Sequence, residues 1–503
     1  MDFIRINRFT KFVIAISLVS ALPAQAISDR PTDRLCPAQL QSEVEKIAKS
    51  PKLQASRVGV FVQTKAPNPQ ILANLDGDRY FTPSSNVKLF TTAIALKTLG
   101  ADYRFATRLM SRNLPNAQGE LENGLWLVGS GDPSFSSATG LKSLVTQLKN
   151  KGVRRINGGI WTLTARKGAE ISGTWEWQDL QEYYAAIASP FTINENALNW
   201  TIKATQIGKP AIFEWENPAL AKDWRVDNQA ITITADAEYA LPEDELKVVR
   251  PYGQKLLIIT GQIPENSQPE LGGVAIPDPE ANFLSLLRQE LARQNIEIAP
   301  TTDISNISKK LPPIQDLAIA LSPPLSELIA TTNKDSNNLY AELLLRALGD
   351  RLHEITPDDS VNGGLMMIKK YLQSVNIPAE AVSLVDGSGL SRHNLVTPRA
   401  IARLLASVAS DRTIDAQFHQ SLAIAGVDGT LTNRFKYTFA EGLIQAKTGT
   451  LTGAIALSGY VSPKKYRDII FSIMINNSNL RSRELQQYVD AIAVLLTRLD
   501  TCQ

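Results

Sequence analysis

The sequence contains few of the residues that build metal centres and disulfide frameworks. Among its 503 residues there are two cysteines and three histidines, and they form neither a CxxC nor an HExxH pattern. We therefore expect no metal and no cofactor. Cys36 and Cys502 lie near the two ends of the chain. Pairing in an oxidising compartment would tie those ends together, and two unrelated free thiols are the alternative.

The chain also lacks an excess of charge of either sign. It carries 52 Lys and Arg against 50 Asp and Glu, a formal net charge of +2. This balance gives no electrostatic reason for binding nucleic acid, so we expect no nucleic-acid partner. A repeat with a period of about 20 to 50 residues is also missing, which argues against a solenoid.

Beyond the N-terminal region, no apolar run is long enough to cross a membrane. A basic stretch ends at Lys11, and the apolar run Phe12–Leu22 that follows it is too short for a comfortable span. Ala24 and Ala26 then supply the small-x-small pattern of a cleavage site. These features predict a signal peptide over residues 1–26 and export to the periplasm or cell envelope, with at most peripheral membrane contact. An uncleaved anchor or a buried helix is the alternative.

The order of the hydrophobic patterns predicts an α/β (α+β) fold in which one domain is interrupted by an insert. A buried strand is expected at Val58–Val62, and a hairpin and a third strand near the C-terminus. Residues 27–103 and 314–503 would form the split domain, and residues 104–313 a strand-rich insert, taken as two small domains. Helices are expected at Asn86–Leu99, Pro279–Gln294, Leu325–Thr331, Leu339–Leu348, Gly364–Val375, Pro398–Ala406 and Ser482–Leu499.

The first motif with chemical potential is Ser85 followed three residues later by Lys88. Both lie at the start of a predicted helix, one turn apart and on the same face. A serine hydroxyl becomes a good nucleophile when a neighbouring base takes its proton, and a buried lysine can be neutral enough to do so. The spacing alone is weak evidence, since Ser462 and Lys465 share it in a predicted turn.

A second motif, Ser336 to Asn338, offers a hydroxyl that can pass on a proton and an amide that can hold a peptide group. The same pattern occurs at Ser360–Asn362 and Ser374–Asn376. We favour Ser336 because it stands at the entry to an apolar predicted helix.

The third motif is Lys447, Thr448 and Gly449, which is expected to follow the short strand Leu443–Ala446 and open a hairpin. The lysine and threonine can bind a carboxylate, and a glycine lets a substrate backbone approach closely. Lys447 is also a candidate for the second cation that keeps Lys88 neutral.

Taken in this order, the three motifs resemble the SxxK, SxN and KTG signature of penicillin-binding proteins and serine β-lactamases. The closer resemblance is to the D-Ala-D-Ala carboxypeptidase/endopeptidase family of class C low-molecular-mass penicillin-binding proteins, where a long insert separates the first two motifs. Further similar stretches are Asp386–Asn394 and Gly426–Leu431, with Gly129–Pro133 as a landmark inside the insert.

The resemblance implies a serine DD-peptidase that acts on peptidoglycan stem peptides and is covalently inhibited by β-lactams. Ser85 would attack the carbonyl between two terminal D-alanines, and Lys88 would accept its proton. Ser336 would relay a proton and Asn338 would orient the peptide. The motifs leave open how the activity divides between carboxypeptidase and endopeptidase, because both reactions use the same acyl-enzyme.

The same resemblance implies the substrate-binding residues. Lys447 and Thr448 would hold the terminal carboxylate beside Gly449, and the N–H groups of Ser85 and Thr450 would bind the oxyanion. Arg392 would bind the peptide side chain, with a structural salt bridge as the alternative.

Two rival functions share this scaffold. A class A β-lactamase also needs a Glu-x-x-Leu-Asn element. Glu195–Asn199 has that pattern but precedes the second motif, so we interpret it as a coincidence. The other rival is a non-catalytic penicillin-binding or wall-binding protein, for which a lost motif residue would be the signal.

Overall fold

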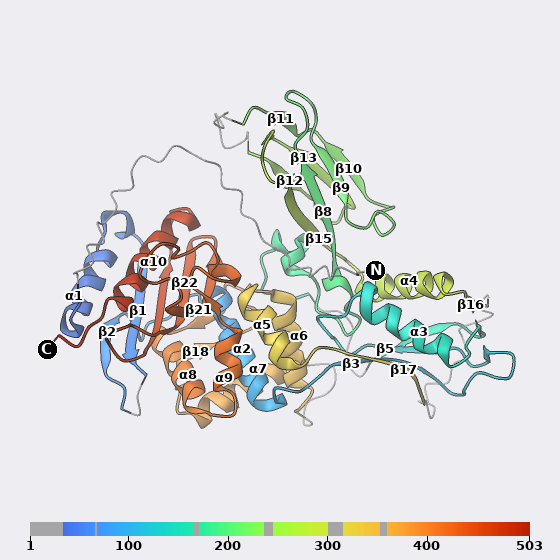
Figure 1. Ribbon diagram of the computed structural model, residues 1–503, viewed down its shortest axis with the longest axis horizontal. Helices are drawn as coiled ribbons and strands as arrows, with labels where there is room; N and C mark the ends of the chain where they lie inside the picture. The colour runs from blue at the N-terminus through green and yellow to red at the C-terminus, as the bar shows by residue number, and fades with distance from the viewer. Residues whose placement is uncertain are drawn as a thin grey trace, which may run out of the picture. The chain divides into compact units, whose positions relative to one another are not determined.

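The computed structural model describes residues 34–65, 68–164, 171–235, 245–299, 315–352 and 360–502 (Figure 1). The predicted signal peptide, residues 1–26, lies outside the described residues. A disulfide joins Cys36 to Cys502, which confirms the pairing that the sequence left open. Leu35 also forms a β-bridge with Leu499 beside it, so the start and the end of the described chain are held together.

A six-stranded antiparallel sheet forms the framework of the larger part of the molecule, in the order β2-β1-β23-β22-β21-β20. The N-terminal strand β1 pairs with β23 along its whole length, so the two ends of the sequence share one sheet, as predicted. The strands are β1 (Arg57–Thr64), β2 (Ile71–Leu75), β20 (Ala423–Ile424), β21 (Ile444–Leu451), β22 (Ala454–Val461) and β23 (Ile469–Asn476).

Two hydrophobic cores cover the two faces of this sheet, because neighbouring residues of a strand point to opposite sides. Ile473 belongs to one core, which includes helices α1 (Pro37–Ala48) and α10 (Ser482–Thr497). Met474 belongs to the other. That second core contains α2 (Val87–Leu99), α5 (Leu325–Lys334), α6 (Asn338–Gly349), α7 (Ser360–Ser374), α8 (Pro398–Ser410) and α9 (Asp415–Ser421).

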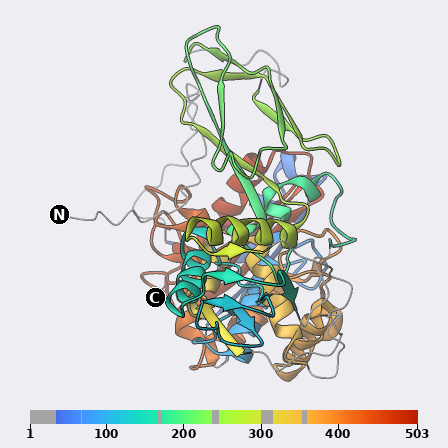
Figure 2. The same ribbon diagram turned by 90° about the vertical axis from the view of Figure 1, so that its right-hand side faces the viewer.

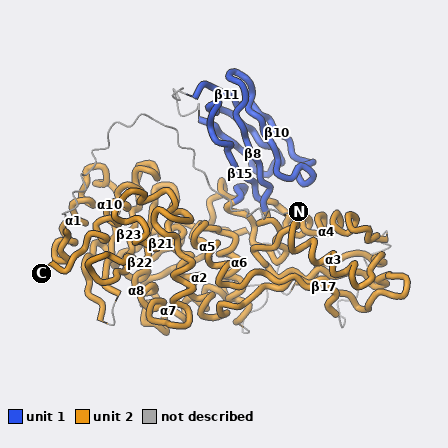
Figure 3. The backbone as a smooth tube through the Cα atoms, viewed as in Figure 1, with its two compact units in different colours: residues 1–31, 181–183, 197–275 blue, residues 32–180, 184–196, 276–503 orange. Residues whose placement is uncertain are grey.

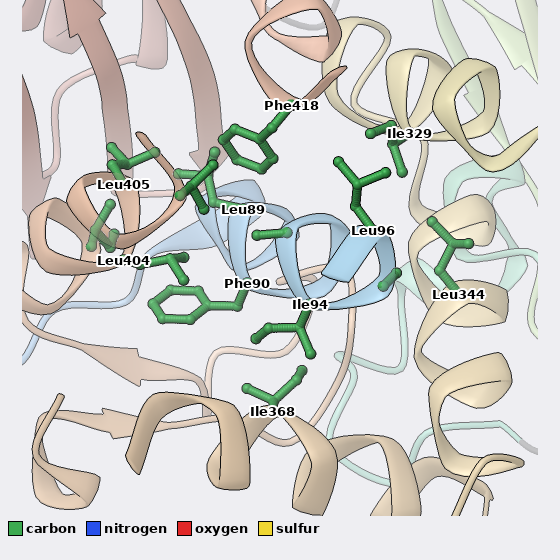
Figure 4. Packing of buried hydrophobic residues seen from close by; sticks show 14 of the residues in the cluster. Leu89, Phe90, Ile94, Leu96, Ile329, Leu344, Ile368, Leu404, Leu405 and Phe418 are labelled. Atoms are coloured by element: carbon green, nitrogen blue, oxygen red, sulfur yellow. The ribbon is translucent and has the colours of Figure 1, made fainter. Parts of the chain in front are cut away.

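Helix α2 lies at the centre of the second core and is buried on every side. Each residue from Val87 to Leu96 is buried, including the polar Lys88, Thr91 and Thr92. Figure 4 shows Leu89, Phe90 and Ile94 pointing outward from α2 in different directions toward the surrounding helices. This packing fixes the start of α2, where the first motif lies.

Part of the predicted insert belongs to the same compact unit as the sheet. Its strands form the three-stranded sheet β16-β6-β4 and, together with β17 just after the predicted insert, the four-stranded sheet β17-β3-β5-β7. Helices α3 (Lys142–Asn150) and α4 (Pro279–Arg293) lie side by side next to them (Figure 2). The strands are β3 (Ala106–Ser111), β4 (Glu120–Leu121), β5 (Leu125–Val128), β6 (Arg155–Ile156), β7 (Ile160–Leu163), β16 (Glu297–Ile298) and β17 (Gln315–Leu321).

The rest of the insert forms a second compact unit (Figure 3). Its described residues are 181–183, 197–235 and 245–275. It is a small β structure around a core that includes Ile202 and Ile259. The boundaries predicted at residues 103/104 and 313/314 stay a prediction. The strands of this unit are β8 (Ala197–Lys203), β9 (Ile212–Trp215), β10 (Arg225–Asn228), β11 (Ile231–Ile233), β12 (Lys247–Val249), β13 (Leu256–Thr260), β14 (Gln262–Pro264) and β15 (Glu270–Ala275).

Most predicted elements overlap observed ones, but the strand of the third motif differs. The sequence predicted a strand that ends at Ala446 and a hairpin opened by Lys447. That was wrong, because β21 continues to Leu451 and the turn falls at Thr452 and Gly453. The reason is the register with β22, in which Lys447 pairs with Ser458. The third motif therefore lies inside a paired strand.

Candidate active site

Ser85 lies in a single 3-10 turn, Ser84–Asn86, that leads directly into α2. The backbone of Ser84 has a φ of +50°, a conformation that a non-glycine residue rarely adopts. Strain of this kind persists where the surrounding structure holds the residue in place. The buried helix behind the turn and two closely packed segments in front of it do so here.

Two glycines allow those segments to approach the turn. A Cβ atom added at Gly389 would lie 1.9 Å from the carbonyl oxygen of Ser84, and one at Gly449 would lie 2.8 Å from that of Pro83. No larger residue fits at either position without a shift of the backbone. The third motif thus lies against the nucleophile turn because Gly449 has no side chain.

Lys88 lies one turn after Ser85, and its side chain is fully buried. Its Nζ atom is 3.0 Å from Ser85 Oγ, 2.6 Å from Asn338 Oδ1 and 2.7 Å from the carbonyl oxygen of Ser388. Burial lowers the pKa of Lys88 from 10.5 to about 7, against the opposing effect of the Asp386 and Glu342 carboxylates. About half of such side chains are neutral at pH 7, so Lys88 can accept a proton.

The second motif lies at the start of α6. Ser336 has a φ of +59°, and the side chain of Asn337 caps the helix by accepting the N–H of Tyr340 at 3.1 Å. This geometry turns the Ser336 hydroxyl toward Lys447 and the Asn338 amide toward Lys88. The competing patterns at residues 360–362 and 374–376 lie on and just after α7 instead.

The third motif supplies a second buried lysine. Lys447 Nζ donates to Ser336 Oγ at 2.9 Å and to the carbonyl oxygen of Thr448 at 2.9 Å. The Thr448 hydroxyl donates to Thr430 Oγ1 at 2.9 Å, and Thr450 is exposed. Thr430 belongs to the Gly426–Leu431 stretch, whose role the sequence alone did not reveal.

Lys88 acts electrostatically on Lys447. Burial lowers the pKa of Lys447 well below 10.5, and the nearby charge of Lys88 lowers it further, whereas Asp335 raises it. For Lys88 the largest cause is burial itself. The expectation that Lys447 keeps Lys88 neutral therefore stays a prediction, because burial alone accounts for the lowered pKa of Lys88.

A loop after α7 closes the site around Lys88, and its anchors were not predicted. Asp386 is buried and accepts the N–H groups of Gly389 at 2.8 Å and Ser391 at 2.7 Å. Glu342 of α6 accepts those of Gly387 and Ser388 at 3.0 and 2.9 Å. The repeated Gly and Ser of Asp386–Asn394 signalled a turn, but nothing in the sequence linked that turn to Glu342.

A segment of the insert packs against the same loop. Trp175 Nε1 donates to Asp386 Oδ2 at 3.0 Å, and Glu176 pairs with Arg392 at 2.8 Å. The Arg392 guanidinium also donates to the carbonyl oxygen of Thr452 at 2.9 Å. The salt bridge that the sequence left open for Arg392 is thus present, and its role in substrate binding stays a prediction.

A second segment of the insert contacts the second motif. Asn338 Nδ2 donates to the carbonyl oxygen of Tyr184, and Asn337 Nδ2 donates to Glu195 Oε2, both at 2.8 Å. Burial raises the pKa of Glu195, and Asp335 raises it further, against the hydrogen bond from Asn337. Glu195 was set aside as a chance match, yet it lies beside the site.

Among the described residues, no group of three or more His, Cys, Asp and Glu side chains could hold a metal ion. Within the same ranges, no helix has the length and apolar character needed to cross a membrane. Asp132 of the Gly129–Pro133 landmark is buried and accepts the N–H of Ser134 at 2.9 Å, as in an ordinary loop turn.

Comparison with known proteins identifies the family. The family described as "D-Ala-D-Ala carboxypeptidase 3 (S13) family" matches residues 40–499. The chain belongs to this family. It is therefore a serine-type D-Ala-D-Ala carboxypeptidase, as the motifs predicted. A D-alanyl-D-alanine carboxypeptidase from Actinomadura sp. (strain R39) is 30% identical over 496 residues, which cover 96% of this chain and 88% of the relative.

Solved structures of family relatives show the same fold. The crystal structure of penicillin binding protein 4 (dacB) from Haemophilus influenzae matches with a TM-score of 0.75 and 25% identity, over 90% of this chain and 98% of that chain. The same protein complexed with a novel β-lactam matches with a TM-score of 0.71 and 24% identity, over the same shares of both chains. The predicted α/β fold of the penicillin-binding type is confirmed.

Proposed function

We propose that this carboxypeptidase removes the terminal D-alanine of peptidoglycan stem peptides through an acyl-enzyme on Ser85. The observation that carries the proposal is the meeting of three motifs, far apart in the sequence, around one hydroxyl. Lys88 lies 3.0 Å from Ser85 Oγ, and Lys447 and Ser336 lie 2.9 Å from each other. Nucleophile, base and a second hydroxyl are the parts that acyl transfer requires.

In the acylation step the Ser85 hydroxyl gives its proton to neutral Lys88, and its oxygen attacks the carbonyl carbon between the two D-alanines. The backbone N–H groups of Ser85 and Thr450 stabilise the oxyanion that forms. The C–N bond then breaks, and the leaving amine receives a proton through Ser336. Water hydrolyses the resulting ester, and Ser85 recovers its proton.

Substrate orientation comes from the other motif residues. Asn338 binds a peptide group of the substrate, and Lys447 with the Thr448 hydroxyl binds the terminal carboxylate beside Gly449. A charged donor and a neutral donor that bind one carboxylate together strengthen binding and fix the orientation of the peptide. Arg392 acts at the edge of the site on the peptide side chain.

The natural partners follow from this chemistry. Stem peptides of peptidoglycan are the substrates, and the enzyme reaches them after export, in the periplasm or cell envelope. β-Lactams acylate Ser85 because their strained amide occupies the place of the D-Ala-D-Ala bond, and the opened ring stays attached. The β-lactam complex of the Haemophilus influenzae protein supports this.

The decisive experiment compares the wild type with Ser85→Ala on purified muropeptides. Mass spectrometry of the products separates release of D-alanine from cleavage of a cross-link, which distinguishes carboxypeptidase from endopeptidase activity. We expect Ser85→Ala to release neither product. Activity retained in Ser85→Ala would remove Ser85 from the mechanism.

Sustained turnover of a penicillin would instead favour the β-lactamase alternative, whereas a long-lived acyl-enzyme supports a peptidase. A protein that is acylated by penicillin but cleaves no muropeptide would be a penicillin-binding sensor. Intact-mass measurement over time follows the penicillin acyl-enzyme, and the masses of the muropeptide products show whether the same enzyme cleaves them.

A further inference from the structure

One buried carboxylate in the active-site region is not used by any of the three motifs. Glu342 lies four residues after Asn338 on α6, so both side chains project from the same face of the helix. Its side chain is only 4% exposed. Burying a carboxylate costs free energy unless donors surround it, so its partners indicate what it does.

Those partners are all hydrogen-bond donors. One oxygen accepts the backbone N–H groups of Gly387 and Ser388 at 3.0 and 2.9 Å. The other faces the Arg346 guanidinium at 3.2 Å. Glu342 therefore fastens the loop at residues 387–388 to the helix that carries the second motif.

The same loop is fastened to α2 as well. The Thr91 hydroxyl donates to the carbonyl oxygen of Gly387 at 2.7 Å. A Cβ atom added at Gly387 would lie 2.8 Å from the carbonyl oxygen of Ala341, so the loop is packed directly on the backbone of α6. The next carbonyl group, that of Ser388, points at Lys88 Nζ at 2.7 Å.

This carbonyl matters because of how a neutral amine must be oriented. Neutral Lys88 has two hydrogens and one lone pair, and the lone pair has to face Ser85 Oγ to accept its proton. Asn338 Oδ1 and the Ser388 carbonyl oxygen, at 2.6 and 2.7 Å, are the two acceptors that can take those hydrogens. With both in place, the lone pair points at Ser85, 3.0 Å away.

We propose that Glu342 is a positioning residue for the catalytic base: it holds the Ser388 carbonyl against Lys88 and so aims the lone pair of that amine at Ser85. This proposal rests on the proposed function, in which Lys88 is the base. The carboxylate does not touch the substrate, and it acts through the loop at residues 387–388.

The pH dependence of acylation can test this role, because the charges around Lys88 affect its pKa. The Asp386 and Glu342 carboxylates favour the protonated form of Lys88. Replacing Glu342 with a neutral residue removes one of the carboxylates that raise the pKa of Lys88. A Ser388 carbonyl released from Lys88 also stabilises the ammonium less. Both changes lower the pKa of Lys88.

The test measures acylation by a fluorescent penicillin as a function of pH in the wild type and in Glu342→Ala, which removes the oxygen that accepts the N–H groups of Gly387 and Ser388. We expect the limb on which the rate rises with pH to move to lower pH by about one unit. The plateau rate should fall by about 10-fold or more because the lone pair is no longer aimed. A matched control is Asp490→Ala. Asp490 lies on α10, and its carboxylate is paired with Arg434.

The control should lower stability and leave the pH profile unchanged, because α10 lies in the other core. A Glu342→Ala enzyme with the wild-type limb and plateau would overturn the proposal. Should Glu342→Ala not fold, Gly387→Ala decides, since its methyl group pushes the loop away from α6. A plateau reduced by about 10-fold supports the proposal, and an unchanged plateau overturns it.

Different results would contradict the proposed function and the positioning role of Glu342. Acylation that survives in Ser85→Ala contradicts the proposed function itself. Loss of acylation in Ser85→Ala, together with a wild-type profile in Glu342→Ala, contradicts the positioning role alone.

Discussion

The close approach of β21 to the nucleophile turn leads to a sharp prediction for Gly449→Ala. A Cβ atom at this position would lie 2.8 Å from the carbonyl oxygen of Pro83 and 3.0 Å from both Asn86 Nδ2 and the Cβ atom of Ser84. Ordinary van der Waals contacts begin near 3.4 Å. The added methyl group meets three atoms at once, and two of them belong to side chains that are themselves fully buried.

The clash can be relieved only if β21 and the turn separate by about half an ångström. Overpacking of this kind costs about 1–3 kcal/mol of stability. The larger effect is expected in catalysis, because Thr450 is the next residue and its N–H is one of the two proposed oxyanion donors. Loss of one such donor, or a misplacement of about 1 Å, lowers the rate about 100-fold.

The assay is the second-order rate constant for acylation by a fluorescent penicillin, with the folded fraction measured in parallel by circular dichroism. Gly173→Ala is the matched control, because its added methyl group meets nothing within 4 Å. We expect the control to acylate at the wild-type rate. If folded Gly449→Ala acylates within about threefold of the wild-type rate, the close approach of β21 to the nucleophile turn does not set the oxyanion geometry.

Three further predictions concern the base, the disulfide and the insert. The acylation rate should rise with pH through about 7, because only neutral Lys88 accepts a proton; a stopped-flow profile that is flat from about pH 5 to pH 9 would contradict this. Cys36→Ser should lower the free energy of unfolding by about 2–5 kcal/mol in urea, because it opens the bond to Cys502; an unchanged midpoint would show that this bond contributes nothing. Glu195→Ala should leave the lifetime of the penicillin acyl-enzyme unchanged, because its described partner is Asn337 rather than Ser85; a much longer lifetime by intact mass would give Glu195 a role in deacylation.

The sequence was sufficient to predict the elements whose signal is local. The helix after Ser85 was predicted over Asn86–Leu99 from its helix formers, its apolar side and Gly100 behind it, and the observed α2 spans Val87–Leu99. The sequence has an N-terminal strand pattern and a C-terminal pattern of strands and helices, separated by a strand-rich middle segment. This arrangement predicted that the N-terminal and C-terminal strands belong to one domain. The terminal cysteines pointed to a bond that the structure contains.

What the sequence could not predict are contacts made by backbone atoms and by residues far apart in the chain. The Ser388 carbonyl on Lys88 has no side-chain signature, and it is placed by Glu342, a residue that reads as part of an apolar helix. The length of β21 was missed because its register with β22 overrides the turn-like residues Thr448 and Gly449.

The substrate's terminal carboxylate bears on how the two buried lysines share protons. Burial lowers the pKa of both lysines, Asp335 opposes burial at Lys447, and Glu342 and Asp386 oppose it at Lys88. The charge of Lys88 lowers the pKa of Lys447 further. A substrate carboxylate bound at Lys447 favours the charged form of that lysine. Two ammonium groups repel each other inside one buried site, so charging Lys447 drives the proton from Lys88. On this reasoning the terminal carboxylate both orients the peptide and prepares the base that attacks it.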